Sequence, residues 1–180
     1  MNYCDRPLIV TDLETTGLDA NLHDIIEIGA IRLHPQTLEE TGRLDIKVKI
    51  EHPDTVQSQA LLRNGYKEAL WKDAVSLADA MAMYSHLAVW GILVAYNITF
   101  EHSFLQEAFR RCGSNIDKVL DYHRIDLPSL LWFQNPKRET ISLNVVCKEF
   151  GIEPEPIVHR AINGAETTVK LLRKIRGCNG

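Results

Sequence analysis

The sequence predicts an α/β domain in which a mixed β-sheet is flanked by helices. Two features of the pattern predict it: three strand-like segments come first, and strands then alternate with helical segments in the second half of the chain. Apolar residues make up 45% of the 180 residues and charged residues 24%, an ordinary composition for a globular domain with its own core. We therefore expect residues 1–180 to form a single domain.

The first three strands follow from hydrophobic periodicity. An apolar run that begins at Leu8 ends in a polar loop with a glycine, as a buried strand does. Residues 25–33 have the apolar positions of a central strand, and residues 44–50 alternate between apolar and polar, which is typical of one solvated face. The turn-rich residues 34–42 make the last two segments an antiparallel pair.

Helical spacing begins after residue 55 and then alternates with two further strands. The Asn64-Gly65 pair is a helix stop signal, and it closes the first helix. The strands are expected at residues 92–95 and 119–127. The helices are expected at residues 58–63, 76–89, 99–112, 129–133, 142–150 and 160–176.

Charge and cysteine content limit the function classes. A formal net charge of −4 does not indicate a nucleic-acid-binding protein, but acidic residues dominate residues 1–56 and basic residues dominate residues 157–180. A basic end beside an acidic site suits a metal-dependent enzyme acting on phosphates, and equally a cationic C-terminal helix that complements its own dipole. The scattered cysteines and the lack of a long apolar run predict a cytoplasmic protein with reduced thiols and no membrane partner.

Asp12 and Glu14 are the first candidate functional residues. Because side chains alternate along a strand, both project from one face, where two carboxylates repel each other unless they hold a cation or carry a proton. Oxygen ligands of this kind suit Mg²⁺ or Mn²⁺. Taken alone, an Asp-x-Glu pair more often marks a solvated strand end, so its partners decide between the two interpretations.

Three segments far apart in the sequence contain the acidic, glycine and histidine residues of a recognisable pattern. They are Asp12-Leu13-Glu14-Thr15-Thr16-Gly17-Leu18 with Ile25-Ile26-Glu27-Ile28-Gly29-Ala30, then Asn97-Ile98-Thr99-Phe100-Glu101, then His159-Arg160-Ala161-Ile162-Asn163-Gly164-Ala165-Glu166. In order and spacing they resemble the DEDDh family of 3′→5′ exonucleases, the group of polymerase proofreading subunits and RNase T-like enzymes. The resemblance covers residues 7–172 and implies a ribonuclease H-like fold, with a five-stranded mixed β-sheet flanked by α-helices. The connecting Arg124-Ile125-Asp126 and Ser142-Leu143-Asn144 also match.

The resemblance also implies roles for individual residues. Members of the family use four acids and a histidine to hold two metal ions against the scissile phosphate. Asp12 would then bind both ions, Glu14 the first, and Glu101 would add a carboxylate, with Mg²⁺ or Mn²⁺ as cofactor and one ion weakly bound or absent. His159 would take a proton from the attacking water, which suits its near-neutral pKa. The implied substrate contacts are Thr15, Thr16, Gly17, Leu18, Asn97 and Phe100.

Two of the four acidic positions differ from the family pattern. Glu101 stands where aspartate is usual, which keeps the charge but adds a methylene. Gly164 takes the place of the last aspartate in H-x-x-x-x-D and offers no ligand. Asn163 lies about 100° round the helix from it and Glu166 about 200°, so neither replaces it directly. Losing one carboxylate ligand costs roughly two to four orders of magnitude in rate.

Two hypotheses of different classes follow. The first is a metal-dependent 3′→5′ exonuclease that releases nucleotides from single-stranded DNA or RNA 3′ ends by a two-metal-ion mechanism, impaired by Gly164 and Glu101. The second is a catalytically inactive module of the same fold that binds nucleic acid or a protein partner. The presence of Asp12, Glu14 and His159 together favours the enzyme.

Overall fold

A computed structural model describes residues 2–177 and contains a five-stranded sheet in the order β3-β2-β1-β4-β5. β1 (Leu8–Thr15), β2 (Ile25–Leu33) and β3 (Glu40–Lys47) are antiparallel neighbours. β4 (Gly91–Ala95) pairs with β1 in parallel, and β5 (Leu120–Asp126) pairs with β4 in parallel. The predicted five-stranded mixed sheet of the ribonuclease H-like fold is confirmed.

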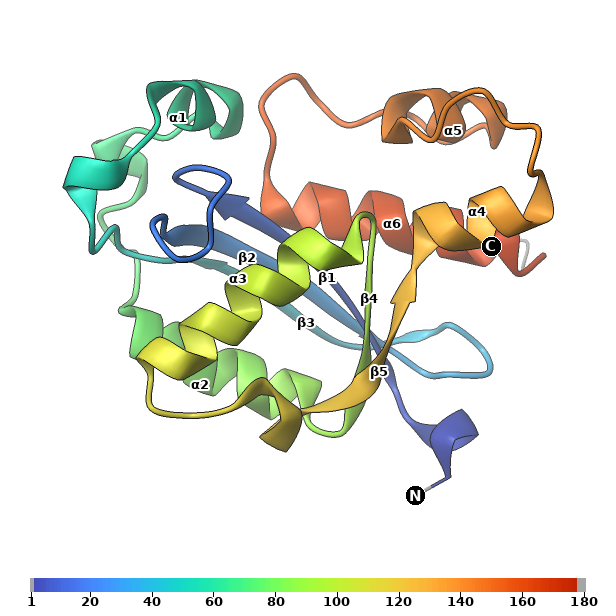
Figure 1. Cartoon of the computed structure of the whole chain (residues 1–180), viewed down its shortest axis with the longest axis horizontal. Helices are drawn as coiled ribbons and strands as arrows, with labels where there is room; N and C mark the ends of the chain where they lie inside the picture. Colours follow the sequence, from blue (N-terminus) through green and yellow to red (C-terminus); the bar gives the residue numbers. More distant parts are fainter. Residues whose placement is uncertain (1, 178–180) are drawn as a thin grey trace.

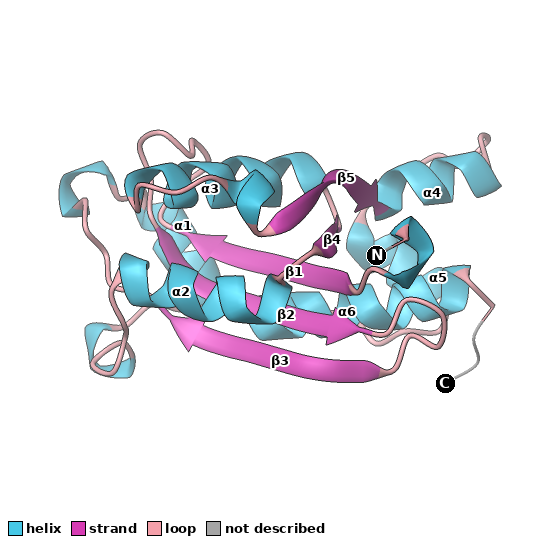
Figure 2. Ribbon diagram, turned by 90° about the horizontal axis from the view of Figure 1, so that it is seen from below, coloured by secondary structure: helices cyan, strands magenta, loops and turns pink. Residues whose placement is uncertain are grey.

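Helices cover both faces of this sheet. Figure 1 and Figure 2 show α2 and α3 against one face and α6 against the other, with α4 and α5 near α6. The helices are α1 (Ser58–Asn64), α2 (Leu77–Ala88), α3 (Ile98–Arg111), α4 (Leu127–Gln134), α5 (Leu143–Glu149) and α6 (Ala161–Ile175). Single 3-10 turns lie at Tyr3–Asp5, Pro53–Thr55, Glu68–Leu70 and Ile116–Lys118.

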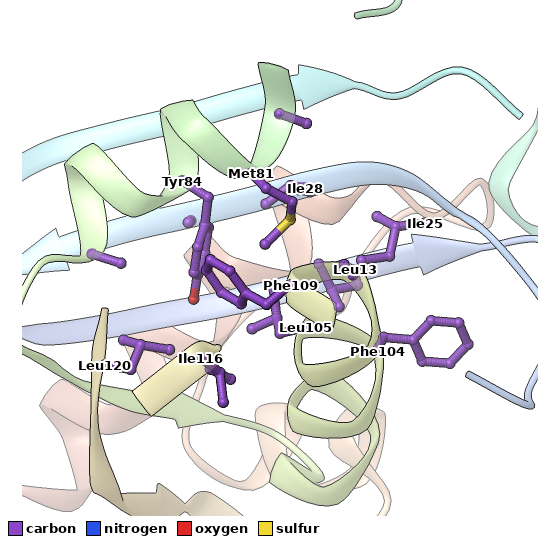
Figure 3. Packing of buried hydrophobic residues seen from close by; sticks show 14 of the residues in the cluster. Leu13, Ile25, Ile28, Met81, Tyr84, Phe104, Leu105, Phe109, Ile116 and Leu120 are labelled. Atoms are coloured by element: carbon purple, nitrogen blue, oxygen red, sulfur yellow. The ribbon is translucent and has the colours of Figure 1, made fainter. Parts of the chain in front are cut away.

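The central strand β1 contributes to two apolar layers. Because side chains alternate along a strand, Ile9 and Leu13 pack with α2 and α3, whereas Leu8 and Val10 pack on the face of α6. The first layer contains buried aromatic rings, among them Tyr84 (Figure 3). The Tyr84 hydroxyl forms a 3.0 Å hydrogen bond with the hydroxyl of Thr11, so this buried polar atom has a partner.

The boundaries of β3 differ from the prediction of residues 44–50. The strand begins at Glu40, because Glu40 pairs with Leu33 across the antiparallel ladder, but its exposed polar side chains give no hydrophobic signal. It ends at Lys47, after which Val48 leaves the ladder and forms an isolated parallel bridge with Val75. The other strands and helices have ends within two residues of the predicted ranges.

Two residues of β2 fix the position of α6. A Cβ on Gly29 would lie 2.2 Å from the backbone carbonyl carbon of Ala161, so only glycine allows the helix to approach this closely. Glu27 is buried; it accepts a 3.2 Å hydrogen bond from the Ala161 N–H and lies 2.5 Å from the Arg160 guanidinium. The first turn of α6, which directly follows His159, is therefore bound to the centre of the sheet.

The basic end of α6 lies far from its first turn. Arg173 donates hydrogen bonds to the Leu38 carbonyl, and Arg176 donates to the carbonyls of Pro35 and Gln36. A helix of this length spans about 22 Å, so these cations bind the turn between β2 and β3 and do not flank the acidic end of β1. Their position fits the helix-dipole interpretation of the basic C-terminal segment.

Two further features bear on the expected environment of the chain. Cys4, Cys112 and Cys147 are free thiols, and Cys178 lies outside the described residues. Within residues 2–177, no helix combines the length and the apolar character that crossing a membrane requires.

We predict that Gly29→Ala lowers the free energy of unfolding by about 3 kcal/mol, because the added methyl group meets rigid backbone of α6. Chemical denaturation measures the loss. Gly42→Ala in β3 is the matched control: its Cβ would meet only the tip of the Leu87 side chain, at 2.8 Å, and should change stability by no more than about 1 kcal/mol. Equal losses in the two variants would contradict the close packing of α6 on β2.

Candidate active site

The four residues predicted to be catalytic meet at one edge of the sheet. The carboxyl ends of the parallel strands β1 and β4 lie together there, and α3 begins directly beyond β4 (Figure 1). Asp12 and Glu14 come from the end of β1, Glu101 from the first turn of α3, and His159 from the loop before α6. All four line one cavity of about 570 Å³. The structure therefore brings together side chains from three distant parts of the sequence.

Four of the residues expected to contact substrate line the same cavity. They are Thr15, Gly17, Leu18 and Phe100. The Leu18 side chain is 79% exposed, so it is free to contact a ligand. Phe100 packs its ring against Phe104 with centroids 4.8 Å apart, which supports the ring from the side of α3.

Thr16 and Asn97 lie elsewhere. Thr16 is fully buried; its hydroxyl accepts a 2.8 Å hydrogen bond from the Asp24 N–H, and its own N–H donates to the Asp24 carbonyl at 2.9 Å. Thr16 therefore holds the ends of the loop together, and it is not part of the cavity lining. Asn97 is exposed outside the cavity lining, in a left-handed turn with φ of 73° before α3. Its neighbour Tyr96 lines the cavity instead.

The loop after β1 is held in one conformation by its neighbours. The Thr15 carbonyl accepts a hydrogen bond from the Asn64 side chain at 3.2 Å, and the Thr16 carbonyl accepts one from the Gln57 N–H at 2.8 Å. A Cβ on Gly17 would lie 2.3 Å from the His23 ring, so glycine is required at this position. These contacts connect the floor of the cavity to α1.

Asp126 positions the start of α3 and hence Glu101. One oxygen of its carboxylate accepts a 3.1 Å hydrogen bond from the Ile98 N–H, and the other accepts one from the Ser129 N–H at 3.0 Å. A single carboxylate therefore caps the amino ends of α3 and α4. This is the structural role of the Arg124-Ile125-Asp126 segment that matches the family pattern.

The carboxyl groups of the cavity are held in an environment that disfavours their charge. Burial raises the pKa of Asp12 well above its ordinary value, and the nearby Glu101 and Glu14 add to the shift. Burial, followed by the charge of Glu27, raises the pKa of Glu14 to about 7. Burial raises the pKa of Glu101 to about 8. A proton or a cation that neutralises these carboxylates therefore stabilises the site.

The residues present fit a divalent cation in their chemistry. Glu101 is only 4% exposed, and its Oε2 atom is buried with no hydrogen-bond partner among residues 2–177. Carboxylate oxygens are the ligands that Mg²⁺ and Mn²⁺ prefer. Over the same residues, no three acidic, histidine or cysteine side chains stand close enough together to form a ready-made ligand cluster. A bound cation would therefore have to draw the carboxylates of the cavity together.

The place of the missing aspartate is filled by Asp12. Gly164 is buried in α6, and a Cβ on it would lie 2.4 Å from Oδ2 of Asp12 and 2.5 Å from its carboxyl carbon. The Asp12 carboxylate thus rests against the bare helix backbone. Glu166 points away and forms a 2.5 Å ion pair with Arg43 of β3, so it does not replace the missing ligand.

Sequence reasoning missed two charged residues of the cavity, Glu155 and Arg63. Glu155 lies four residues before His159. The segment between them is neither helix nor strand, so no periodic spacing identified Glu155 as a site residue. The signal available was the Pro154-Glu155-Pro156 sequence, which restricts the backbone on both sides of one acidic residue. Arg63 lies at the end of α1, which nothing in the sequence connected to the site.

These two residues surround His159. Oε2 of Glu155 lies 3.5 Å from Nδ1 of His159, and the His159 N–H donates a 3.0 Å hydrogen bond to the Arg63 carbonyl. Burial and the charge of Arg63 lower the pKa of His159. The imidazole is therefore neutral at neutral pH, the form that accepts a proton.

Comparison with known proteins identifies one family. A family model described as exonuclease, of the RNase T type, matches residues 9–172. The PolC-type DNA polymerase III of Oceanobacillus iheyensis is 30% identical over 180 residues, which cover 97% of this chain and 12% of that protein. The PolC-type enzyme of Bacillus subtilis is 30% identical over 177 residues, covering 95% and 11%. The chain thus spans a small part of the length of these relatives.

Solved structures show the same fold. Escherichia coli exonuclease I in complex with a dA16 oligonucleotide superposes with a TM-score of 0.77 at 19% identity, covering 94% of this chain and 41% of that one. A zinc-bound form of the exonuclease I complex with single-stranded DNA gives a TM-score of 0.78 at 19% identity, covering 96% and 41%.

We predict that Glu101→Gln stabilises the metal-free protein, increasingly so as the pH rises. The folded pKa of about 8 lies above the ordinary value of 4.5, so the contribution of this carboxyl to stability is complete below pH 4.5 and is lost as the pH rises through 8. The neutral amide avoids this loss. The advantage of the variant should grow by about 4 kcal/mol between about pH 5 and about pH 9. Denaturant unfolding in a chelating buffer measures it.

Glu107→Gln, on the same helix, is the matched control. Hydrogen bonds from Arg110 and then Arg111 lower the pKa of Glu107 to about 2, so its carboxylate is stabilising and the amide should weaken the fold at both pH values. If Glu101→Gln also weakened the metal-free protein at alkaline pH, ionisation of the buried Glu101 carboxyl would not be costing stability.

Proposed function

Because the chain belongs to the RNase T-type exonuclease family, we propose that it is a metal-dependent 3′→5′ exonuclease acting on the ends of single-stranded DNA or RNA. The observation that carries the proposal is the convergence of Asp12, Glu14, Glu101 and His159 on one cavity. We further propose that the chain works as one exonuclease domain. The oligonucleotides bound by exonuclease I, which shares this fold, support a single-stranded substrate.

Asp12, Glu14 and Glu101 are the side chains that would hold the divalent cations, Mg²⁺ or Mn²⁺. When bound, a pair of such ions lowers the pKa of a water molecule and stabilises the oxygen that leaves. The protein supplies the acidic cavity, whose carboxylates would repel one another less with cations bound. Glu101 reaches one methylene further than aspartate, which Mn²⁺ tolerates better than Mg²⁺ because Mg²⁺ demands near-ideal octahedral geometry.

His159 is the general base in this proposal. Its lowered pKa keeps the ring neutral, so it accepts the proton of the water that attacks the phosphate. Its backbone is held by the Arg63 carbonyl on one side and by the first turn of α6 on the other. The backbone at His159 is thereby anchored on both sides.

The remaining cavity residues suit the end of a polynucleotide. Leu18, Tyr96 and Phe100 offer apolar surface on which a terminal base and sugar can pack. Arg63 is exposed at the cavity and supplies a cation for a phosphate group. Both kinds of contact accept any base, so the lining favours an enzyme without strict sequence preference.

We predict that the chain releases nucleotides from a 3′-labelled single-stranded oligonucleotide, faster with Mn²⁺ than with Mg²⁺. Asp12→Asn should reduce the rate by about three orders of magnitude or more, because it removes the carboxylate whose charge interacts with those of Glu101, Glu14 and Glu155. Asp73→Asn, at an exposed position outside the cavity, is the control and should leave the rate unchanged. No turnover above the Asp12→Asn background with either cation would refute the proposal.

We predict that His159→Ala lowers the rate by about 10²- to 10⁴-fold, the usual contribution of a general base. The wild-type rate should rise with pH through the lowered pKa of His159 and then level, and the variant should lose this rise. A pH series of initial rates measures both. A variant that keeps the wild-type pH profile would exclude His159 as the base.

One observation favours a second candidate function. Gly164 provides no ligand and Asp12 occupies its space, so the site is one carboxylate short of the family pattern. A module that binds single-stranded ends without cleaving them would show micromolar or tighter binding of an oligonucleotide and no turnover with Mg²⁺ or Mn²⁺. Turnover with either cation that disappears in Asp12→Asn would reject this alternative.

A further inference from the structure

The cavity contains an acidic residue outside the family pattern. Gly164 leaves the site without one carboxylate, yet Glu155 lines the same cavity as Asp12 and Glu14. The Glu155 side chain is only 9% exposed. Burying a carboxylate beside other carboxylates is costly unless something neutralises it, so this position calls for an explanation.

One oxygen of Glu155 has no bonding partner in the described part of the chain. Oε2 faces Nδ1 of His159 at 3.5 Å, whereas Oε1 is buried without a hydrogen bond. Glu101, from the other side of the cavity, also buries an oxygen without a partner. Two nearly inaccessible carboxylates that line one cavity, each with an oxygen that makes no hydrogen bond, have the chemistry of ligands for a divalent cation.

The backbone around Glu155 has little conformational freedom. Pro154 and Pro156 flank it; the first has a fixed φ, and the second restricts Glu155 to an extended conformation. Further along, Val158 packs against Gly65, where a Cβ would approach its methyl group to 2.6 Å. The loop is therefore anchored to the end of α1, and little entropy is lost when Glu155 binds a ligand.

We propose that Glu155 supplies a carboxylate ligand to the divalent cation of this site, in place of the side chain that Gly164 lacks. The proposal rests on the proposed metal-dependent function. It explains why a chain with glycine at the last acidic position keeps four carboxylates around one cavity: Asp12, Glu14, Glu101 and Glu155.

The test measures the affinity of the intact chain for Mn²⁺ alone. Isothermal titration calorimetry gives the dissociation constant, and electron paramagnetic resonance gives the concentration of free Mn²⁺. Glu155→Gln should weaken binding by about 10- to 100-fold. It should also reduce the rise in melting temperature that saturating Mn²⁺ produces in the wild type. Neither readout depends on catalysis.

Glu153→Gln is the matched control. It removes the same charge from the same loop, but Glu153 is exposed and outside the cavity lining, so Mn²⁺ affinity should not change. Circular dichroism checks that both variants fold. Should the amide of Glu155→Gln destabilise the protein by leaving a polar group buried, Glu155→Ala removes that group and should show the same loss of affinity.

Repeating the measurement in the His159→Ala variant distinguishes two roles for Glu155. It either binds the cation directly or acts by positioning His159. In His159→Ala, a ligand role still predicts a loss of Mn²⁺ affinity of at least about 10-fold on Glu155→Gln. If the loss disappears in this background, Glu155 only positions His159 and the proposal is overturned.

The outcomes also distinguish this proposal from the proposed function. Mn²⁺ binding that is abolished by Asp12→Asn but unaffected by Glu155→Gln would overturn the role of Glu155 and leave the metal-dependent enzyme standing. A wild-type chain that binds no Mn²⁺ would overturn both. Equal losses in Glu155→Gln and Glu153→Gln would reduce the effect to net charge and would likewise overturn the ligand role.

Discussion

The loss of hydration that carboxylates suffer in one poorly solvated cavity is the cost that the rest of this structure has to offset. Asp12, Glu14, Glu101 and Glu155 come from three separate segments and line one cavity. The shift in the pKa of Glu101 from 4.5 to about 8 alone corresponds to about 5 kcal/mol at alkaline pH. Each large apolar side chain buried in the two layers contributes about 1.5–3 kcal/mol, so a few of them offset that cost. The apolar layers therefore hold the acidic cavity together.

The close approach of α6 to β2 determines the geometry of the site. Gly29 lets the helix backbone touch the sheet, and Glu27 binds the first turn through the Ala161 N–H and Arg160. The same contact places His159 at the cavity and brings Gly164 against the Asp12 carboxylate. Because α6 makes all these contacts, a substitution at Gly29 that shifts the helix would change both the stability of the fold and the geometry of the site.

Residues with local physical signals were predicted well. Alternation and apolar runs identified β1 and β2, and helical spacing with stop signals identified the helices to within two residues. The start of β3 was missed because Glu40 pairs through its backbone while its side chain is exposed, and hydrophobic periodicity does not register such a residue. The burial of Thr16 was not predicted, because it depends on hydrogen bonds to Asp24 that the sequence does not reveal.

The sequence by itself indicated the fold class, because strand and helix periodicity are local properties of the chain. The catalytic candidates Asp12, Glu14, Glu101 and His159 followed from the resemblance of three spaced segments to an exonuclease family. Only the tertiary structure decided which further groups surround them. Glu155 and Arg63 enter the cavity because an irregular loop and the end of a short helix pack together, and no periodic rule links residues so placed. The Asp12 carboxylate likewise fills the space beside Gly164, because β1 packs against α6. The sequence does not reveal this contact between distant segments.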